Sequence, residues 1–480
     1  VMYPCTVSEL TEHLDGRRHA WGSLHPFEAG AAPDQRQIER VVTESGRVVP
    51  GSLFVALRGR NRHGVEFAGE AAARGAVAIL TDQLPTRSVA PESAAAGPPL
   101  ILVPHALTGL QQLAVRNRNH SAASVIGITG SVGKTTTRQM IYCVLSQQRS
   151  SLQSPANFNN EIGLPLALLE LSEQHWYAVL ELGAGRPGDI RFLCRLARPD
   201  WAVVTRVAPC HLESFGSLQA IRLTKQELVE EIPASGCAFL CADQPEVAGM
   251  SRATSAQVEY FGLQAEGVGR CQMVSFEQGR SRIRCGTDEF VYEGGRQLLL
   301  CAAAAVTVGR RAGLLAGQIA AGLQQFRSDR GRGRLLRAGD WQILDETYNC
   351  SPESAVACLK SLSEWNAVRR ILVLGDMLEL GESERELHCD VAATLADSAV
   401  DQAIFCGRLS SICVTAAAAS GYAGDRLHAV ADNQQLQCLL SELLQPGDLI
   451  CLKGSRGLQL EQTVNWLLRQ AAERGGQVIP

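Results

Sequence analysis

The residues with the clearest chemical potential form a short run of glycine, lysine and threonine between two apolar segments. Residues 125–128 are apolar and predict a buried strand, and the apolar spacing of 140–145 predicts a helix. Between them, residues 129–137 read Thr-Gly-Ser-Val-Gly-Lys-Thr-Thr-Thr. A loop of this kind directs backbone N–H groups and a helix N-terminus at phosphate oxygens. The sequence therefore predicts a nucleotide-phosphate site.

This loop is a short form of the G-x-x-x-x-G-K-S/T pattern, because Ile128 stands where the first glycine is usual. Lys134 is spaced to reach the outer phosphates, and the hydroxyl of Thr135 is spaced to bind Mg²⁺. The other phosphate contacts are expected from Gly130, Ser131, Gly133 and Thr136. The alternative interpretation is an ordinary glycine-rich turn between a strand and a helix.

Polar residues at the ends of two later strands are candidates for the same site. Glu181 lies at the end of the apolar run 178–182, where a phosphate-loop sheet holds its ligands, so it is a candidate Mg²⁺ ligand. The alternative is a solvated carboxylate. His211 follows the predicted strand 202–207 and would reach the same edge, although a lone histidine is more often structural. Lys225, in a predicted helix, by itself indicates only a surface lysine.

Two further strand ends suit the base and ribose of a nucleotide. Tyr348 and Asn349 follow the predicted strand 342–345, and a flat ring with an amide suits adenine. The alternative there is a turn with an Asx bond. Asp376 closes the predicted strand 371–375 and could accept hydrogen bonds from ribose hydroxyls.

Two polar clusters complete the set of candidates. Lys453, Ser455 and Arg456 follow the run 449–452 and suit a carboxylate or phosphate. The segment 157–163 holds three asparagines before an apolar helical stretch, and helix capping explains one of them. Its other two asparagines have no local explanation.

Composition narrows the class of protein. Of the 480 residues, 46% are hydrophobic and 20% charged, and the net charge is −4, which argues against a general nucleic-acid or membrane-surface binder. The 16 cysteines are scattered without a C-x-x-C pair, so we expect free, mostly buried thiols in a reducing compartment rather than a zinc site. The absence of a long apolar run and of a signal-like N-terminus predicts a cytoplasmic protein without a membrane span.

Strands and helices alternate along most of the chain, which predicts an α/β fold with parallel sheets covered by helices on both faces. A loop rich in Pro, Ser, Ala and Gly spans 86–99, and a basic glycine-rich stretch at 327–334 indicates a linker. We expect three domains: 1–104, 105–329 and 330–480. The apolar runs that predict the other strands are 51–57, 76–80, 100–103, 238–240 and 403–407, and the remaining helices are 67–74, 107–116, 164–171 and 218–230.

Taken together, these segments resemble the Mur ligase family, the ATP-dependent amide-forming enzymes of peptidoglycan precursor synthesis. The resemblance covers most of residues 50–466. Seven segments carry it in the same order along the chain: 129–137, 157–163, 181–190, 211–217, 345–352, 374–381 and 453–456. Each segment is weak by itself, but seven in order over this length are very unlikely by chance.

The resemblance implies a fold and a reaction. It implies a UDP-sugar-binding domain, a central phosphate-loop ATPase domain with a parallel sheet, and a Rossmann-like α/β domain that closes over the nucleotide and binds the incoming amine. ATP would phosphorylate the terminal carboxylate of UDP-MurNAc-tripeptide, and the amine of D-alanyl-D-alanine would attack the acyl phosphate. The products are the amide, ADP and phosphate, made by a protein expected to be a monomer.

The resemblance also implies roles for individual residues. Thr135 and Glu181 would hold one Mg²⁺ and His211 a second. Lys225 matches a lysine that family members carry as a carbamate, which turns a cation into an anionic oxygen ligand. Lys134, Lys225, His211 and Arg334 would be catalytic, with Arg334 on the γ-phosphate. Tyr348 and Asn349 would hold adenine and Asp376 the ribose, and Asn159 would also contact ATP. Lys453, Ser455 and Arg456 would contact a substrate.

The N-terminal region departs from the family pattern. The family usually has Asp-Ser-Arg beside the uracil, and the aligned residues here are Glu44, Ser45 and Gly46, with Arg47 one place later. A family Asp-Gly-His is replaced by residues 63–65, His-Gly-Val. Ser45 and Arg47 are the expected substrate contacts. The changes motivate one alternative, a paralogue that joins another carboxylate or amine. A second alternative is an ATP-binding switch that makes no amide.

Overall fold

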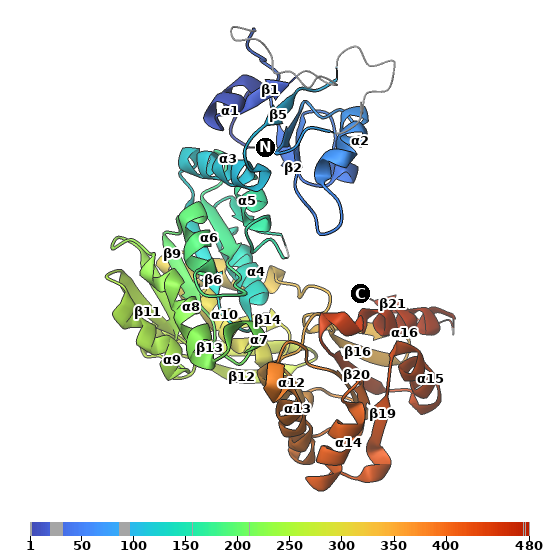
Figure 1. The fold of residues 1–480 in the computed structure, drawn as a ribbon. Helices are drawn as coiled ribbons and strands as arrows, with labels where there is room; N and C mark the ends of the chain where they lie inside the picture. Colours follow the sequence, from blue (N-terminus) through green and yellow to red (C-terminus); the bar gives the residue numbers. More distant parts are fainter. Residues whose placement is uncertain are drawn as a thin grey trace. The chain divides into compact units, whose positions relative to one another are not determined.

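The computed structural model describes residues 2–19, 32–85, 97–155, 157–210, 212–473, 475 and 477–479. His211 and most of the predicted loop at 86–99 lie outside these ranges. The chain divides into two compact units, one of residues 1–127, 149–183 and 190–201 and one of residues 128–148, 184–189 and 202–480. Figure 1 shows the sheets and the helices that accompany them.

The first sheet belongs to the N-terminal part of the chain. Its strand order is β1-β5-β4-β3-β2, with β2 to β5 parallel and β1 antiparallel at one edge. Its short strands β3 and β4 are buried along their whole length. The elements are α1 (Val7–His13), β1 (Arg17–His19), β2 (Arg40–Val42), β3 (Ser52–Ala56), α2 (Ala68–Ala73), β4 (Ala78–Thr81), β5 (Leu100–Leu102) and α3 (Ala106–His120).

The second sheet carries the phosphate loop. Its order is β11-β10-β9-β6-β8-β7, so that β6, the strand before the loop, is an interior strand between β9 and β8. The strands are β6 (Ser124–Thr129), β7 (Ser151–Gln153), β8 (Tyr177–Glu181), β9 (Trp201–Val204), β10 (Cys237–Cys241) and β11 (Gln257–Phe261). The helices are α4 (Lys134–Leu145), α5 (Gly163–Leu168), α6 (Asp189–Ala197), α7 (Leu212–Phe215), α8 (Leu218–Glu230), α9 (Pro245–Ala248), α10 (Leu299–Arg311) and α11 (Ala316–Gln325).

A three-stranded antiparallel sheet follows, which was not predicted from the sequence. It is formed by β12 (Cys271–Glu277), β13 (Arg280–Cys285) and β14 (Asp288–Glu293). Cys271 and Cys285 lie opposite each other in register, their Cα atoms 4.2 Å apart, and form a disulfide. The expectation that all cysteines are free is therefore wrong for this pair, because the hairpin that aligns them was not recognised. The other 14 are free and mostly buried, as expected.

The C-terminal sheet has seven strands in the order β19-β18-β17-β20-β16-β15-β21, with β16 to β20 parallel and an antiparallel hairpin of β15 and β16. Apolar clusters cover both faces of it. The strands are β15 (Arg334–Ala338), β16 (Trp341–Glu346), β17 (Arg369–Gly375), β18 (Gln402–Cys406), β19 (Leu427–Val430), β20 (Asp448–Lys453) and β21 (Val478–Ile479). The helices are α12 (Pro352–Leu362), α13 (Glu384–Ala393), α14 (Ser410–Ala419), α15 (Asn433–Leu443) and α16 (Glu461–Glu473).

The predicted elements agree with the observed ones apart from their ends. The α4 helix begins at Lys134, six residues before the first apolar position used to predict it, because the phosphate-loop threonines already form its first turn. Strand β9 ends at Val204, since the residues after Thr205 bond to the phosphate loop instead of a neighbouring strand. The predicted linker is irregular up to Gly333, and Arg334 is the first residue of β15.

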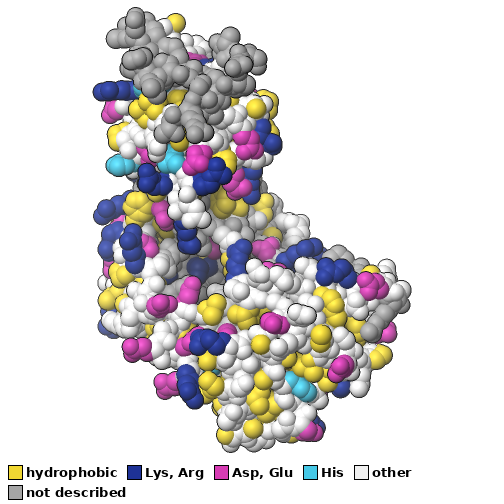
Figure 2. Space-filling view, turned by 45° about the vertical axis from the view of Figure 1, so that its right-hand side comes forward, with side chains coloured by type: hydrophobic (Ala, Val, Ile, Leu, Met, Phe, Trp, Pro, Cys, Tyr) yellow, Lys and Arg dark blue, Asp and Glu magenta, His cyan; other side chains and the backbone are white. Residues whose placement is uncertain are grey.

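The distribution of charged side chains on the surface and the hydrophobicity of the helices are consistent with the amino-acid composition. Figure 2 shows basic and acidic side chains interspersed over the face drawn, with apolar side chains scattered among them. None of the helices in the described ranges is both long enough and apolar enough to cross a membrane.

Candidate active site

The phosphate loop depends on two glycines with left-handed backbone conformations. Gly130 has φ +145° and Gly133 has φ +87°. A Cβ on Gly130 would lie 2.0 Å from Thr205 Oγ1, so no side chain fits there. The Thr205 hydroxyl donates to Val132 O at 2.7 Å, and its backbone N–H donates to Thr129 O. The end of β9 therefore holds the loop from both sides.

The remaining loop residues are placed as a phosphate site requires. Lys134 Nζ donates to Gly130 O at 2.7 Å, so the ammonium folds back over the loop. Ser131 Oγ exchanges hydrogen bonds with the backbone of Ala208, at 3.0 Å each. Thr135 and Thr136 are buried in the first turn of α4. The loop ends at the N-terminus of a helix, the kind of position that binds anions, and its phosphate contacts stay predictions.

Lys225 is buried in the interior of α8, contrary to the surface position that the sequence alone suggested. Only 3% of the residue is exposed, and its Nζ lies 5.8 Å from the ring centre of Phe215. Burial, followed by the positive charge of Lys134, lowers the pKa of Lys225 to about 8. An amine with this pKa is partly neutral near pH 7 and can act as a nucleophile.

The first compact unit holds two more of the predicted residues. Glu181 is the last residue of β8 and is buried, and its N–H donates to Ser154 Oγ at 3.2 Å. Asn159 accepts from the N–H of Gly183 through its backbone oxygen. Asn160 Oδ1 accepts from the N–H groups of Ile162 and Gly163 just before and at the start of α5, but the N-cap residue itself is Ile162, so none of the three asparagines occupies the cap position.

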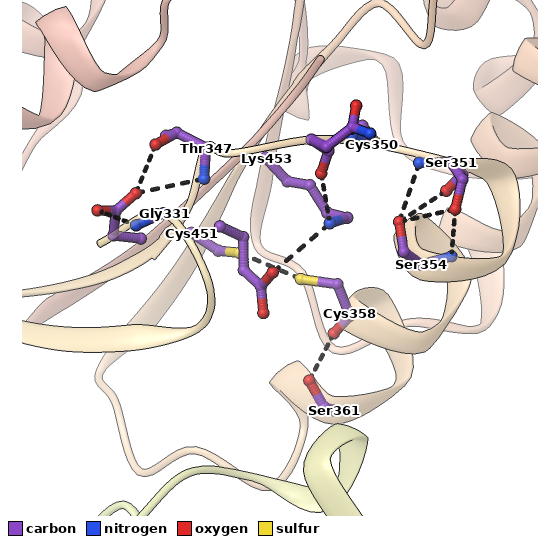
Figure 3. A network of polar contacts seen from close by, with 12 residues as sticks. Gly331, Thr347, Cys350, Ser351, Ser354, Cys358, Ser361, Cys451 and Lys453 are labelled. Carbon is purple, nitrogen blue, oxygen red and sulfur yellow. Dashed lines mark hydrogen bonds and ion pairs between the residues drawn. The ribbon is translucent and has the colours of Figure 1, made fainter. Parts of the chain in front are cut away.

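The loop after β16 is tied to the linker by one buried carboxylate. Asp345 accepts from the N–H of Gly331 at 2.8 Å and from the hydroxyl of Thr347 at 2.6 Å, as Figure 3 shows. Tyr348 donates its N–H to Gly331 O. Gly331 has φ +77°, and a Cβ there would meet Tyr348 at 2.9 Å. The linker and the predicted adenine segment are consequently one packed structure.

Lys453 is buried against the Tyr348–Asn349 segment and is not exposed at the surface. Its Nζ donates to Asn349 O at 3.2 Å and lies 3.5 Å from Glu346 Oε2 (Figure 3). Burial, the largest single influence, lowers the pKa of Lys453, but the Glu346 carboxylate and the neighbouring Cys350, Cys358 and Cys451 together outweigh it, so the pKa lies above its usual value. These contacts fit a positioning role, and the substrate contact expected from the sequence stays a prediction.

Replacement of Lys453 tests this role. Lys453→Met keeps the length of the side chain but leaves the partly buried Glu346 carboxylate without its cation. We expect the free energy of unfolding to fall by about 2 kcal/mol and the KM for ATP to rise, because Asn349 loses its anchor. Denaturant unfolding and initial rates measure the two effects. A variant with wild-type stability and a changed KM only for the amine substrate would instead favour the substrate role.

The ring of Tyr348 is flanked by two arginines. The guanidinium of Arg332 lies 3.7 Å from the ring centre and that of Arg456 lies 5.5 Å from it. Asn349 is exposed, and its Oδ1 accepts from the N–H of Cys350. Arg332 was not predicted, because only Arg334 was singled out in the basic linker. Its position between two glycines was the available signal.

The side chains of Asp376 and Ser455 both accept hydrogen bonds from backbone N–H groups. The carboxylate of Asp376 accepts from the N–H groups of Arg408 and Leu409, at 2.7 and 3.2 Å. Ser455 Oγ accepts from the N–H of Leu378 at 2.9 Å. Asp376 is buried beside the start of α14, so its predicted ribose contact would have to use its remaining acceptor capacity.

The predicted uridine contacts lie in the first compact unit. Ser45 Oγ donates to Glu70 Oε2 at 2.7 Å, and Arg47 forms an exposed ion pair with Glu44. His63 is one of the residues that differ from the family pattern. It is buried, and its Nε2 lies 2.8 Å from Asp82 Oδ1. His63 therefore has a local structural partner in the place where the family has an aspartate.

Three family models match the chain in the order expected from the resemblance. A model described as Mur ligase family, catalytic domain, matches residues 37–118. Mur ligase middle domain matches 128–293, and Mur ligase, glutamate ligase domain, matches 331–456. The chain belongs to the Mur ligase family. Its α/β fold with parallel sheets is the fold expected from the sequence.

Relatives of this Mur ligase span nearly its whole length. A protein of Bacillus subtilis (strain 168) is 33% identical over 91% of this chain and 94% of its own. One of Escherichia coli (strain K12) is 30% identical over 97% and 99%. Both are named UDP-N-acetylmuramoyl-tripeptide--D-alanyl-D-alanine ligase. This chain therefore resembles MurF within the family.

Solved structures agree with the sequence relatives. The crystal structure of MurF from Acinetobacter baumannii superposes on this Mur ligase with a TM-score of 0.84, at 26% identity over 98% of this chain and 99% of the other. MurF of Thermotoga maritima in complex with ADP gives a TM-score of 0.75, at 26% identity over 91% and 99%. An adenine nucleotide is thus bound by a protein of the same fold.

Proposed function

We propose that this Mur ligase joins D-alanyl-D-alanine to UDP-MurNAc-tripeptide, using ATP and releasing ADP and phosphate. The observation that carries the proposal is a lysine, Lys225, that is buried in α8 and whose pKa is lowered by this burial and then by the charge of the phosphate-loop lysine, Lys134. A general nucleotide-binding loop has no need of a second lysine with a lowered pKa. We propose these substrates because the relatives that are named as ligases for them align with 91% and 97% of this chain. The cytoplasm and a monomeric state stay predictions.

The chain's own residues supply the steps of this reaction. The N–H groups of the phosphate loop and Lys134 would orient the γ-phosphate toward the substrate carboxylate, with Arg334 as a further cation. The carboxylate attacks phosphorus, the bond to the β-γ bridging oxygen breaks, and ADP leaves. The neutral amine then adds to the acyl phosphate carbon, the tetrahedral intermediate expels phosphate, and the amine nitrogen gives up one proton to solvent as the amide forms. Positioning and charge neutralisation provide most of the catalysis, because one anion must approach another.

Magnesium fits the donors that the chain presents. Within the described ranges, no group of three or more His, Cys, Asp and Glu side chains is placed to hold a metal by itself. Mg²⁺ in phosphoryl-transfer sites takes one or two protein oxygens and completes its shell with phosphates and water. We propose the Thr135 hydroxyl and the Glu181 carboxylate as such oxygens, and His211 as a ligand of a second ion. Bound Mg²⁺ would neutralise phosphate charge.

We further propose that Lys225 is carbamylated. The neutral amine attacks CO₂, an N–C bond forms, and a proton is released to solvent. With a pKa of about 8, about one amine in ten is neutral at pH 7, whereas an ordinary lysine is almost fully charged. The carbamate would convert a buried cation beside Lys134 into its ion-pair partner. Burial is the main cause of the lowered pKa of Lys225, and the carbamate removes the second cause, the like-charge repulsion from Lys134.

A ligation assay tests the function. Purified protein with ATP, Mg²⁺, UDP-MurNAc-tripeptide and D-alanyl-D-alanine is expected to form the pentapeptide product and phosphate in equal amounts, both followed by mass spectrometry and phosphate release. Turnover that needs a different carboxylate or amine would favour the paralogue alternative, which the altered segment around Ser45 and His63 motivates. Hydroxylamine in place of the amine should give a hydroxamate. ATP hydrolysis without hydroxamate or amide would favour the switch alternative.

A further inference from the structure

An ion pair connects the phosphate loop to the segment proposed to hold adenine. Arg206 lies just after β9, and Glu353 lies in the first turn of α12, four residues after Asn349. A guanidinium nitrogen of Arg206 contacts Glu353 Oε1, and the two side chains are 35% and 20% exposed. Both residues belong to the same compact unit. The pair therefore spans the two places that one ATP molecule must contact.

Arg206 is attached to the phosphate loop through its backbone. Its carbonyl oxygen accepts from the N–H of Ser131 at 2.7 Å. The next residue, Val207, is held by the side-chain amide of Gln244, which accepts from its N–H at 2.8 Å and donates to its carbonyl at 3.1 Å. A shift of the phosphate loop would consequently move the Arg206 backbone with it.

Glu353 lies in the helical turn that directly follows the Tyr348–Asn349 segment. Ser351 is the N-cap of α12, and its hydroxyl accepts from the N–H of Ser354. A carboxylate in the first turn is also favoured by the helix dipole. Burial raises the pKa of Glu353 and the charge of Arg206 opposes this effect. The carboxylate is therefore partly desolvated and depends on its arginine.

We propose that Arg206 and Glu353 are positioning residues for ATP, and that their ion pair sets the spacing between the phosphate loop and the Tyr348–Asn349 segment. This inference rests on the proposed use of ATP. Loss of either partner leaves the other half-buried and uncompensated, which displaces the segment it belongs to. ATP can then no longer contact the phosphate loop and the Tyr348–Asn349 segment in their best geometry at the same time, and the affinity of the protein for ATP falls.

The chain provides a matched control pair. Arg296, in the 3-10 helix Arg296–Leu298, contacts Glu364, which lies beyond the other end of α12. This pair also joins the region before the linker to the C-terminal sheet, but it is remote in sequence from Ser131 and Asn349. A general loss of contact between these regions would follow from removing either pair. A specific effect on ATP would follow only from removing Arg206 or Glu353.

The test is a double-mutant cycle read out by ATP binding. Arg206→Ala, Glu353→Ala, the double variant, Arg296→Ala and Glu364→Ala are titrated with ATP and Mg²⁺ by calorimetry, well below their melting temperatures. We expect each variant of the first pair to weaken ATP binding about tenfold, the double variant to be no worse than either single one, and the control pair to stay within about twofold of wild type. Arg206→Lys and Glu353→Asp should each restore part of the affinity.

Three outcomes overturn the proposal. Glu353→Ala with unchanged or tighter ATP binding would mean that Arg206 acts on the phosphates alone. Equal losses in both pairs would mean a general contact effect, and wild-type affinity in every variant would remove the role entirely. These results are separate from the ligase assignment, since wild-type protein that binds ATP without forming amide contradicts only the proposed reaction.

Discussion

Lys225→Ala is expected to lower the rate of amide formation by about 10²–10³-fold while the protein stays folded. The substitution removes the group that would carry the carbamate and leaves a small apolar residue in a buried position, so little stability should be lost. Short carboxylates such as formate or acetate should restore part of the activity, because they can place an anionic oxygen in the vacated space. Initial rates with and without these anions, beside a thermal unfolding curve, measure the prediction.

The lysine content of the chain makes a clean control possible. The sequence has only four lysines, Lys134, Lys225, Lys360 and Lys453. Lys360 is exposed on α12, so Lys360→Ala should keep full activity. Protein equilibrated with ¹³C-bicarbonate should show a carbamate signal that disappears in Lys225→Ala and persists in Lys360→Ala. Retention of activity within a few-fold in Lys225→Ala, or a carbamate signal unaffected by it, would contradict the proposed modification.

The direction of the pH effect follows from the lowered pKa. Carbamate forms from the neutral amine, whose fraction falls about tenfold for each pH unit below a pKa of about 8. Enzyme depleted of CO₂ at low pH should therefore be inactive and regain activity on addition of bicarbonate near pH 8. Lys225→Ala should not respond to bicarbonate.

Most of the strands that carry the candidate site could be predicted from sequence. Glu181, Tyr348, Asp376 and Lys453 each follow an apolar run that the structure confirms as a strand, so local patterning was sufficient to place them at strand ends. What these side chains contact could not be predicted. Lys453 pairs with Glu346, more than 100 residues earlier in the chain, and this contact depends on the pairing of β16 with β20.

The missed features share a physical cause. Arg332 on Tyr348 and Arg206 on Glu353 are contacts between side chains whose neighbours in sequence give no periodic signal. The burial of Lys225 likewise results from packing around α8, because the same helical pattern is compatible with an exposed lysine. The β12–β14 sheet is a different case. Its middle strand alternates exposed and buried residues after a Gln278-Gly279 turn, a period-2 signal that was present in the sequence.

Gly130→Ala is expected to abolish ATP binding and to destabilise the protein. Two effects combine at this position. The φ of +145° is unfavourable for alanine by about 1–3 kcal/mol, and the new methyl group would lie 2.0 Å from Thr205 Oγ1 and 3.1 Å from the backbone of Arg206. The loop can relieve the overlap only by moving away from β9, which breaks the bond from Ser131 N–H to Arg206 O. Calorimetric titration with ATP and denaturant unfolding measure both effects.

A second glycine separates the backbone effect from the steric one. Gly313, between α10 and α11, has φ +82° and would bring no atom within 4 Å of a new Cβ. Gly313→Ala should therefore show only the conformational cost, with ATP binding unchanged. Thr205→Ala in the Gly130→Ala background should recover part of the stability, since it removes the atom nearest the new methyl group. If Gly130→Ala instead binds ATP as the wild type does, the bond between Ser131 and Arg206 is not needed, and the phosphate loop is more adaptable than its contacts with β9 indicate.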